Sequence, residues 1–254
     1  MKSNKYAVLS QTSLLIIVFG ILVAMATMPA ARSARYVVYK AMCHYYNAPP
    51  RWSVVRLFDK YAENFDEHLT TTLEYKTPYY LTEFIHSNAT LTNPIKKVLD
   101  LGCGTGLLGQ ALIKQFNIES LTGVDLSTKM LKKSKDKKIY NLLYKADILE
   151  YLQSDNESYD TITAADVFIY VGDLKAVMTA VHQRLKLNGY FAFSVETIDS
   201  GTFTLTSSGR FQHSLNYLQL LAIEIGFQNI KYNSVELRKE HNVMVPGYII
   251  LMQK

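Results

Sequence analysis

Cysteine is scarce in this chain of 254 residues, which limits how the fold can be cross-linked. Cys43 and Cys103 are the only two cysteines, too few for a disulfide framework or a thiolate metal site. A large excess of one charge is also missing, since the formal net charge is +5. The sequence therefore excludes a disulfide-stapled scaffold, fits a reducing compartment and predicts no metal site.

A concentrated share of the net positive charge lies in one run, Lys132-Lys-Ser-Lys-Asp-Lys-Lys138. We interpret this run as a solvated surface following the second strand and its helix, with a patch for nucleic acid or anionic lipid as the alternative. No aromatic residue interleaves the run, as it would in many surfaces that bind single-stranded nucleic acid. We therefore expect no nucleic-acid partner.

The most informative segment is Val98-Leu-Asp-Leu-Gly-Cys-Gly-Thr-Gly106, an apolar strand followed by three closely spaced glycines. Gly102, Gly104 and Gly106 have no Cβ, so the backbone can turn tightly and bring its amides close to a ligand at the next helix N-terminus. The pattern indicates a nucleotide-cofactor site. One alternative is a dinucleotide site, because Gly104-Thr-Gly-Leu-Leu-Gly109 satisfies its fingerprint.

Asp100 separates the two kinds of cofactor. Two residues before the first glycine, its carboxylate would repel a pyrophosphate but attract an α-amino group. S-adenosylmethionine (SAM) has such a group, and its ribose offers two hydroxyls to one carboxylate. Asp125, at the end of the apolar strand Leu121–Asp125, is placed for the ribose. The residues therefore favour SAM over NAD.

At this point the chain resembles the class I SAM-dependent methyltransferases. Three stations match in order: Leu99-Asp-Leu-Gly-Cys-Gly-Thr-Gly106, Thr122-Gly-Val-Asp-Leu-Ser-Thr-Lys-Met-Leu131 and Tyr144-Lys-Ala-Asp-Ile-Leu149. The resemblance implies that Met130 packs on adenine, that Asp147 binds the adenine amino group and that Ile148 supplies a backbone contact. An alternative for Asp147 is a helix cap before Leu149.

The apolar spacing over Trp52–Leu69 predicts a helix. In class I methyltransferases such N-terminal helices commonly lie over the cofactor, so the resemblance implies a lid here, with Tyr61 and Phe65 as its candidate contacts. Simple packing onto the sheet is the alternative for both. Cys103 is interpreted as a small residue that fits beside the ligand and not as a nucleophile. The predicted cofactor-binding residues are Tyr61, Asp100, Gly102, Cys103, Gly104, Gly106, Asp125, Leu126, Met130, Asp147 and Ile148.

A finer resemblance links the chain to a branch of predicted methyltransferases associated with TPR repeats. It rests on Leu57-Phe-Asp-Lys-Tyr-Ala-Glu-Asn-Phe-Asp-Glu-His-Leu69, Ala164-Ala-Asp-Val-Phe-Ile-Tyr-Val-Gly-Asp-Leu174 and Gly209-Arg-Phe-Gln-His-Ser214. That branch implies no defined substrate. The stretch between the apolar N-terminal segment and Arg56, about 25 residues long, cannot hold one TPR repeat of about 34 residues.

Strand and helix patterns alternate and predict an α/β fold, a Rossmann-like seven-stranded sheet with helices on both faces. The expected strands cover 98–101, 121–125, 141–145, 159–165, 189–196, 229–237 and 248–253, and the expected helices 107–116, 174–185 and 214–225. No helix separates the last two strands, so they should pair antiparallel. The resemblance implies the strand order 3-2-1-4-5-7-6, whereas a dehydrogenase would continue its parallel winding.

The acceptor of the methyl group should bind at the carboxyl ends of the fourth and fifth strands. Asp166, Tyr170 and the loop 199–213 lie there. Arg210 is placed to grip an anionic group and His213 to act as a base near neutral pH, so the predicted catalytic residues are His213, Asp166 and Arg210. The alternatives are that His213 caps the next helix and that Asp166 bonds to its own turn.

The N-terminal region has no charged residue from Leu14 to Ala31. A helix of these 18 residues would be about 27 Å long, near the minimum for crossing a bilayer. More basic residues follow the segment than precede it, and SAM is made in the cytosol, so we expect a cytosolic domain. A cleaved signal peptide and a helix packed on the domain are the alternatives.

The sequence thus predicts a membrane anchor or signal-like segment at 1–31, a linker and interfacial helix at 32–55 and a methyltransferase domain at 56–254. The predicted protein is a single-pass membrane enzyme that transfers a methyl group from SAM to a small-molecule or lipid-like acceptor. The alternatives are a methyltransferase-fold protein that binds without turnover and an NAD-type oxidoreductase.

Overall fold

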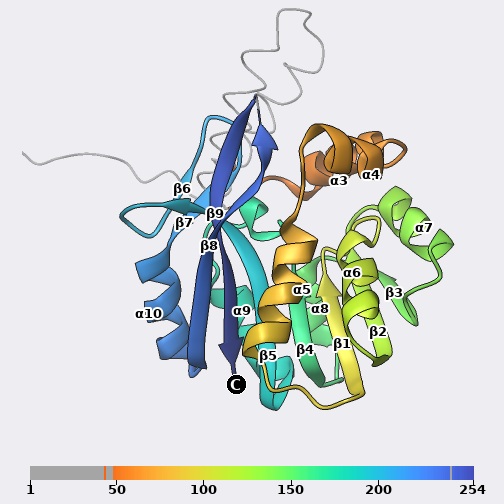
Figure 1. Cartoon of the computed structure of the whole chain (residues 1–254). Coiled ribbons are helices and arrows are strands. Elements are labelled where there is room, and N and C mark those ends of the chain that lie inside the picture. The colour runs from red at the N-terminus through yellow and green to blue at the C-terminus, as the bar shows by residue number, and fades with distance from the viewer. Residues whose placement is uncertain (1–42, 44–47, 241) are drawn as a thin grey trace, which may run out of the picture. The chain divides into compact units, whose positions relative to one another are not determined.

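The computed structural model describes residue 43 and residues 48–240 and 242–254. Its contacts divide the chain into two units at Pro50, and Arg51–Lys254 form one of them (Figure 1). Because helix α3 begins at Arg51, the predicted domain start at residue 56 falls inside a helix. The predicted anchor at 14–31 lies outside the described residues. Within the described part, no helix is long and apolar enough to cross a membrane.

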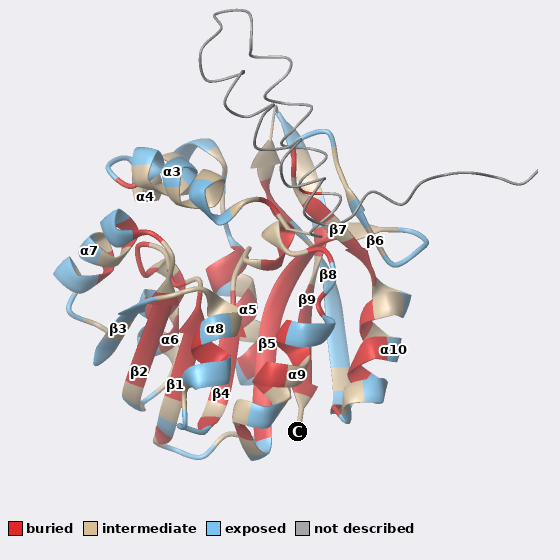
Figure 2. Cartoon of the chain, turned by 180° about the vertical axis from the view of Figure 1, so that it is seen from behind, coloured by how far each residue is buried: buried red, intermediate tan, exposed pale blue. Residues whose placement is uncertain are grey.

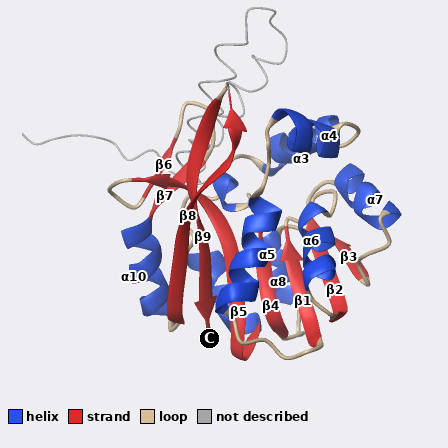
Figure 3. Cartoon of the chain, viewed as in Figure 1, coloured by secondary structure: helices blue, strands red, loops and turns tan. Residues whose placement is uncertain are grey.

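Helices and strands alternate along the unit Arg51–Lys254 (Figure 3). The helices are α3 (Arg51–Tyr61), α4 (Phe65–Glu67), the π-helix η1 (His68–Thr72), α5 (Thr77–Asn88), α6 (Leu107–Gln115), α7 (Thr128–Asp136), α8 (Ile148–Ser154), the 3-10 helix η2 (Phe168–Tyr170), α9 (Lys175–Arg184) and α10 (Leu215–Ile225). The strands are β1 (Ile95–Leu101), β2 (Ile118–Asp125), β3 (Leu142–Lys145), β4 (Tyr159–Ala164), β5 (Leu185–Ile198), β6 (Phe203–Leu205), β7 (Phe211–Ser214), β8 (Gln228–Glu240) and β9 (Val243–Gln253).

One sheet contains the strands of the described residues. Strands β3, β2, β1, β4 and β5 are parallel neighbours in that order. Strand β9 then pairs antiparallel with β5, and β8 pairs antiparallel with β9. The order 3-2-1-4-5-9-8 is the predicted methyltransferase order once two extra short strands are numbered, so the prediction of an antiparallel pair at the end is confirmed.

The extra strands β6 and β7 correct the prediction of seven strands and of a loop at 199–213. They form a hairpin, and β7 also pairs parallel with the end of β5. Glu196 of β5 stands opposite Gly247 of β9 and Gln212 of β7, so these two strands lie on opposite edges of β5. Strands as short as Phe203–Leu205 carry too few residues for an alternating pattern to reveal them.

The hydrophobic core has two layers, one on each face of the sheet. Helices α8, α9 and α10 cover one face and bury residues such as Phe191 and Phe193, while α5 and α6 cover the other with Leu81 and Leu112 among the buried side chains. Figure 2 shows the central strands buried between these helices. Both faces are therefore closed, and the carboxyl ends of the parallel strands meet at one edge of the sheet.

Candidate cofactor and acceptor site

The glycine loop joins β1 to α6 at this edge. Gly102 and Gly104 have φ angles of +63° and +53°, which side chains rarely adopt. A Cβ at Gly102 would lie 2.4 Å from Val167, whereas one at Gly104 would meet nothing nearer than 4.0 Å. The loop therefore packs on one side and leaves room beside Gly104, as a ligand at the N-terminus of α6 requires.

Asp125 ends β2 beside this loop. Its Oδ2 accepts a hydrogen bond from the Gly104 amide at 2.9 Å, and its Oδ1 accepts from the Ser127 amide at 2.7 Å. Burial raises the pKa of Asp125, and these two amides oppose the rise. Each carboxylate oxygen keeps a second lone pair, so the residue can still receive the ribose hydroxyls.

Asp100 lies at the end of β1 with 1% of its surface exposed. Tyr140 donates to its Oδ2 at 2.6 Å, and Thr163 of β4 donates to its Oδ1 at 3.3 Å. Burial raises the pKa of Asp100 to about 7, against the effect of these two hydrogen bonds. Bringing a cationic amino group to this carboxyl would favour its ionised form.

Asp147 follows β3 and caps α8, as the alternative interpretation held. Its Oδ1 accepts from the Leu149 amide at 2.9 Å. Its Oδ2 lies 3.3 Å from Arg51 Nε of α3, so this carboxylate also faces the N-terminal helix. Ile148 begins α8 and packs against the core, and Met130 is buried in the first turn of α7. The third motif lies beside the second, because β3 pairs with β2 and Lys145 stands opposite Asp125.

The other two predicted contacts lie in the same loops. Cys103 is buried within the glycine loop, and burial raises the pKa of its thiol well above the usual value. A thiol that stays protonated is a poor nucleophile, consistent with its interpretation as a small packing residue. Leu126 follows Asp125 and is half-buried. Among the described residues, no group of three or more His, Cys, Asp or Glu is arranged to hold a metal ion.

Helices α3 and α4 are tied to the cofactor stations by polar contacts. Ser127 donates to Asp59 at 2.5 Å, Lys133 pairs with Glu63 at 2.6 Å, and Lys137 pairs with Asp66 at 2.6 Å. Asp66 also accepts from Thr105 in the glycine loop. The basic run is therefore more than a solvated surface, because two of its lysines hold the N-terminal helices.

The two aromatic residues predicted to contact the cofactor from these helices, Phe65 and Tyr61, lie in different surroundings. A Cβ at Gly104 would lie 4.0 Å from the ring of Phe65, so of the two lid candidates Phe65 is the one that lies at the glycine loop. Tyr61 is 45% exposed, and its ring centroid lies 6.1 Å from that of His68. Phe58, which the sequence analysis did not single out, lies between Phe65 and Tyr170, with ring centroids 6.0 and 5.6 Å away. An aromatic row thus links the lid to the acceptor side.

Asp166 follows β4 in a left-handed conformation, with φ of +54°. Such a conformation is uncommon outside glycine and is concentrated at functional sites. The Ser194 hydroxyl accepts from the Asp166 amide at 2.8 Å and donates to Asp166 Oδ1 at 2.9 Å. Arg238 of β8 donates to Asp166 Oδ2 at 3.3 Å and also to Glu196. The carboxylate is therefore held on both oxygens.

Arg210 joins the same group of charges, which we call the acceptor-side network: Asp166, Glu196, Arg210, Arg238 and Glu240. Arg210 pairs with Glu240 and lies 4.0 Å from Glu196. Two guanidinium groups thus face three carboxyl groups. Arg210 is paired within the protein, which reduces its capacity to grip an anionic acceptor.

Two tyrosines border the acceptor-side network. Burial raises the pKa of Tyr170, while a hydrogen bond and charge interaction with Arg210 lower it. Burial and Asp166 raise the pKa of Tyr75 well above its usual value, against a lowering effect of Arg238. Tyr75 precedes Thr77, whose hydroxyl donates to the Leu237 carbonyl at 3.4 Å. The segment after η1 therefore reaches the acceptor side, which the sequence analysis missed.

His213 lies in β7 and is completely buried. Its Nε2 donates to the Gly172 carbonyl at 2.9 Å, and its Nδ1 has no hydrogen-bond partner in the described part of the chain. Burial lowers the pKa of His213 to about 4. The cap of α10 is Ser214, which accepts from the Tyr217 amide, so the alternative role of His213 as a cap is wrong.

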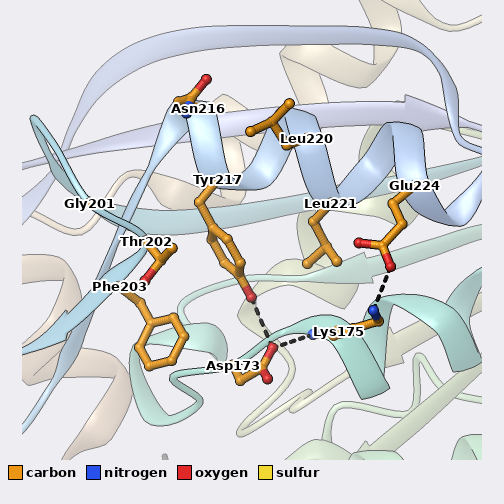
Figure 4. Close-up of a pocket in the computed structure, with 10 residues that line it drawn as sticks. All are labelled: Asp173, Lys175, Gly201, Thr202, Phe203, Asn216, Tyr217, Leu220, Leu221 and Glu224. Carbon is orange, nitrogen blue, oxygen red and sulfur yellow. Dashed lines mark hydrogen bonds and ion pairs between the residues drawn. The ribbon is translucent and has the colours of Figure 1, made fainter.

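A hollow of about 300 Å³ lies between the segment Gly201–Phe203, the start of α9 and α10 (Figure 4). Among its lining residues, Tyr217 donates to Asp173 at 3.0 Å and Lys175 pairs with Glu224 at 2.5 Å. None of the predicted cofactor or catalytic residues lines it. The hollow is therefore separate from the site at the strand ends.

Residues 99–191 match a family model described as a methyltransferase domain. Among curated proteins, the chain is 30% identical over 99 residues to a malonyl-[acyl-carrier protein] O-methyltransferase of Bacillus anthracis, covering 39% of this chain and 36% of that protein. It is 32% identical over 112 residues to a ubiquinone biosynthesis O-methyltransferase of Pasteurella multocida, covering 39% and 46%. The chain thus spans less than half the length of these relatives.

A DhpI–SAH complex is a structural neighbour with a TM-score of 0.58 and 17% identity. The match covers 80% of this chain and 96% of the other. At this identity the likeness shows the fold, and SAH (S-adenosylhomocysteine) is what remains of SAM after its methyl group has left.

Proposed function

We propose that this chain, which carries a class I SAM-dependent methyltransferase domain, transfers the SAM methyl group to an oxygen or nitrogen atom of a small-molecule acceptor. SAM is the cofactor of this domain. The observation that carries the proposal is the row of carboxylates at three adjacent strand ends, Asp100, Asp125 and Asp147, around a glycine loop with open space beside Gly104.

The chain's own residues fit the parts of SAM. Asp100 would hold the amino group, Asp125 the ribose hydroxyls and Asp147 the adenine amino group, each through carboxylate oxygens. When bound, SAM supplies an electrophilic methyl on a sulfonium. The lid formed by α3 and α4 would exclude water, and positioning of the acceptor supplies much of the rate.

The acceptor is proposed to bind near Asp166, Tyr170 and Tyr75. The two curated relatives are named as O-methyltransferases, which supports an oxygen acceptor. Because Arg210 is paired with Glu240, a neutral acceptor group fits better than a carboxylate or a phosphate. The finer resemblance to the TPR-associated branch stays a prediction, as does a lipid-like acceptor.

His213 is the base proposed from the sequence. Its burial and its low pKa make it a weak base without contact to solvent, so we expect it to stabilise the β7 region instead. The His213→Ala variant decides between the roles in single-turnover methyl transfer. A rate about 10²–10⁴-fold lower with unchanged SAM affinity supports the base, and normal turnover excludes it.

Equilibrium binding of SAM and of NADH to the full chain tests the proposed function. We expect SAM to bind and NADH to fail. Labelled SAM with a panel of hydroxyl and amine acceptors then tests turnover, with a variant lacking both Asp100 and Asp125 carboxylates as control. Binding of NADH in place of SAM would contradict the proposal.

We further propose that residues 14–31 anchor the protein with its methyltransferase domain in the cytosol. The uncharged run of 18 residues supports this, as does the cytosolic source of SAM. After extraction with alkaline carbonate, the protein should remain in the membrane pellet, and protease added outside sealed cells should spare the domain. A shortened protein outside the cytosol would contradict the anchor.

A further inference from the structure

Tyr140 lies between α7 and β3, outside the three cofactor motifs. Its hydroxyl donates to Asp100 Oδ2 at 2.6 Å, while Thr163 occupies Oδ1 at 3.3 Å. Since Asp100 is 1% exposed, bulk water cannot replace either donor. The orientation of this carboxyl group is therefore fixed by two side chains, and both lie far from Asp100 in the sequence.

Glycines make room for the Tyr140 ring. A Cβ at Gly109 of α6 would lie 2.4 Å from the Tyr140 hydroxyl oxygen, and one at Gly123 of β2 would lie 2.9 Å from a ring carbon. A Cβ at Gly106 would lie 3.0 Å from the ring. Gly109 and Gly123 are not among the glycines with positive φ, so the backbone does not require glycine there. At Gly109 the space for the Tyr140 ring requires glycine, and at Gly123 the ring shares that requirement with Leu143 and Cys103.

We propose that Tyr140 is a positioning residue for cofactor binding, which holds the Asp100 carboxylate toward the amino group of SAM. The inference rests on the proposed function and deepens it. It also gives Gly109 a role of its own, since the third glycine of the apparent dinucleotide fingerprint admits a tyrosine ring and need not approach a pyrophosphate.

The Tyr140 hydroxyl has a second effect, because its hydrogen bond favours the ionised form of Asp100. Burial raises the pKa of Asp100 to about 7, the bonds from Tyr140 and Thr163 lower it, and Asp125 raises it. Cys103 and Tyr75 are the other titratable neighbours, and their own pKa values are raised well above the usual range, so both stay neutral. Removing the Tyr140 hydroxyl should therefore leave a smaller fraction of Asp100 ionised at neutral pH.

Calorimetry with SAM and the full chain tests this role in Tyr140→Phe, which keeps the ring, and in Gly109→Ala, which displaces it. Near pH 7 we expect SAM affinity to fall about tenfold in Tyr140→Phe, as expected for a lost hydrogen bond to a charged group. The deficit relative to the wild type should shrink toward about pH 8.5, where Asp100 ionises in both proteins. Tyr79→Phe, at a 60% exposed position of α5, is the matched control and should bind normally.

Three outcomes would count against the inference. Tyr140→Phe with wild-type affinity and an unchanged pH profile overturns it. An equal loss of affinity at every pH, together with a lower melting temperature, assigns Tyr140 to packing only. A wild-type chain that fails to bind SAM at any pH overturns the proposed function itself, and the role of Tyr140 with it.

Discussion

The proposed cofactor half and the proposed acceptor half of the site are built in different ways. In the cofactor half, Asp125 and Asp147 accept hydrogen bonds from backbone amides, most of them two or three residues away. In the acceptor half, Asp166, Glu196 and Arg238 are joined side chain to side chain, across 42 to 72 residues of sequence. One half depends on local backbone geometry and the other on how β8 is aligned with β5 through β9.

The two kinds of construction suit two different tasks, binding a widely shared cofactor and selecting one acceptor. Backbone amides at strand ends recur wherever the same loop is built, so they suit a cofactor that many proteins share. Long-range side-chain pairs can be changed one at a time without altering the fold, so they suit the selection of an acceptor. Asp100 departs from this pattern in the cofactor half, because the distant side chains of Tyr140 and Thr163 hold its two oxygens.

The largest expected effect is loss of stability when the acceptor-side network is opened. Arg238→Ala would remove a buried guanidinium, 4% exposed, from Asp166 and from the buried Glu196, which among the described residues would keep only Arg210 at 4.0 Å. We expect the free energy of unfolding to fall by about 3–5 kcal/mol, measured by urea denaturation. Lys97→Ala, which breaks an exposed pair with Glu157, should cost at most about 1 kcal/mol. Equal effects of the two variants would remove the contrast between buried and exposed pairs.

The same contrast explains what the sequence could predict. Apolar strands and glycines at fixed spacing predicted the parallel strands and the glycine loop, because these depend on contiguous residues. The resemblance to methyltransferases implied the order of the strands, and the pairing of β3, β2, β1, β4 and β5 confirms it. The roles of Asp100, Asp125 and Asp147 in binding SAM stay predictions. The antiparallel end of the sheet followed from the absence of a helix between the last two strands, and β8 and β9 confirm it.

The acceptor half could not be predicted in the same way. Nothing near Arg238 in the sequence marks it as a partner of Asp166, because only the register of β8 on β9 brings them together. His213 and Arg210 attracted attention as polar residues in a presumed loop, yet that segment is a hairpin that buries the histidine. Burial of a side chain in a short strand leaves no periodic signal.

A second prediction concerns stability against acid in the acceptor half. Because burial lowers the pKa of His213 from 6.5 to about 4, the folded state binds its proton less readily than the unfolded state. The contribution of the neutral His213 side chain to the free energy of unfolding is complete above the unfolded pKa of 6.5 and is lost as pH falls toward 4. Near pH 4.5 the loss should be about 2–3 kcal/mol.

Urea denaturation near pH 7 and near pH 4.5 measures this loss, and His213→Gln is the control. The glutamine amide can replace the bond to the Gly172 carbonyl but does not titrate. The wild type should therefore lose more stability on acidification than the variant does. Parallel losses in the two proteins would show that His213 is not the group responsible.

A third prediction tests the cofactor half. Asp125→Ala should weaken SAM binding by about 1.5–3 kcal/mol, because the ribose loses a charged hydrogen-bond acceptor and the Gly104 amide loses its partner. Calorimetry measures the affinity, and Glu119→Ala, an exposed change on the same strand, is the control. Unchanged affinity in Asp125→Ala would remove this carboxylate from the site.

The smallest expected effect concerns the lid that joins the two halves. Glu63 is an exposed partner of Lys133, whereas Asp66 bonds to Thr105 in the glycine loop as well as to Lys137. An exposed ion pair contributes at most about 1 kcal/mol and weakens with salt, so Glu63→Gln should change the dissociation constant of SAM by less than about fivefold. Asp66→Asn should have the larger effect, because it weakens the only one of these contacts that reaches the glycine loop directly in the described structure.

Calorimetry at low and high salt measures both variants. If Glu63→Gln proves as damaging as Asp66→Asn, the lid is held mainly by the charge of α7, and the cofactor half depends on long-range side chains much as the acceptor half does.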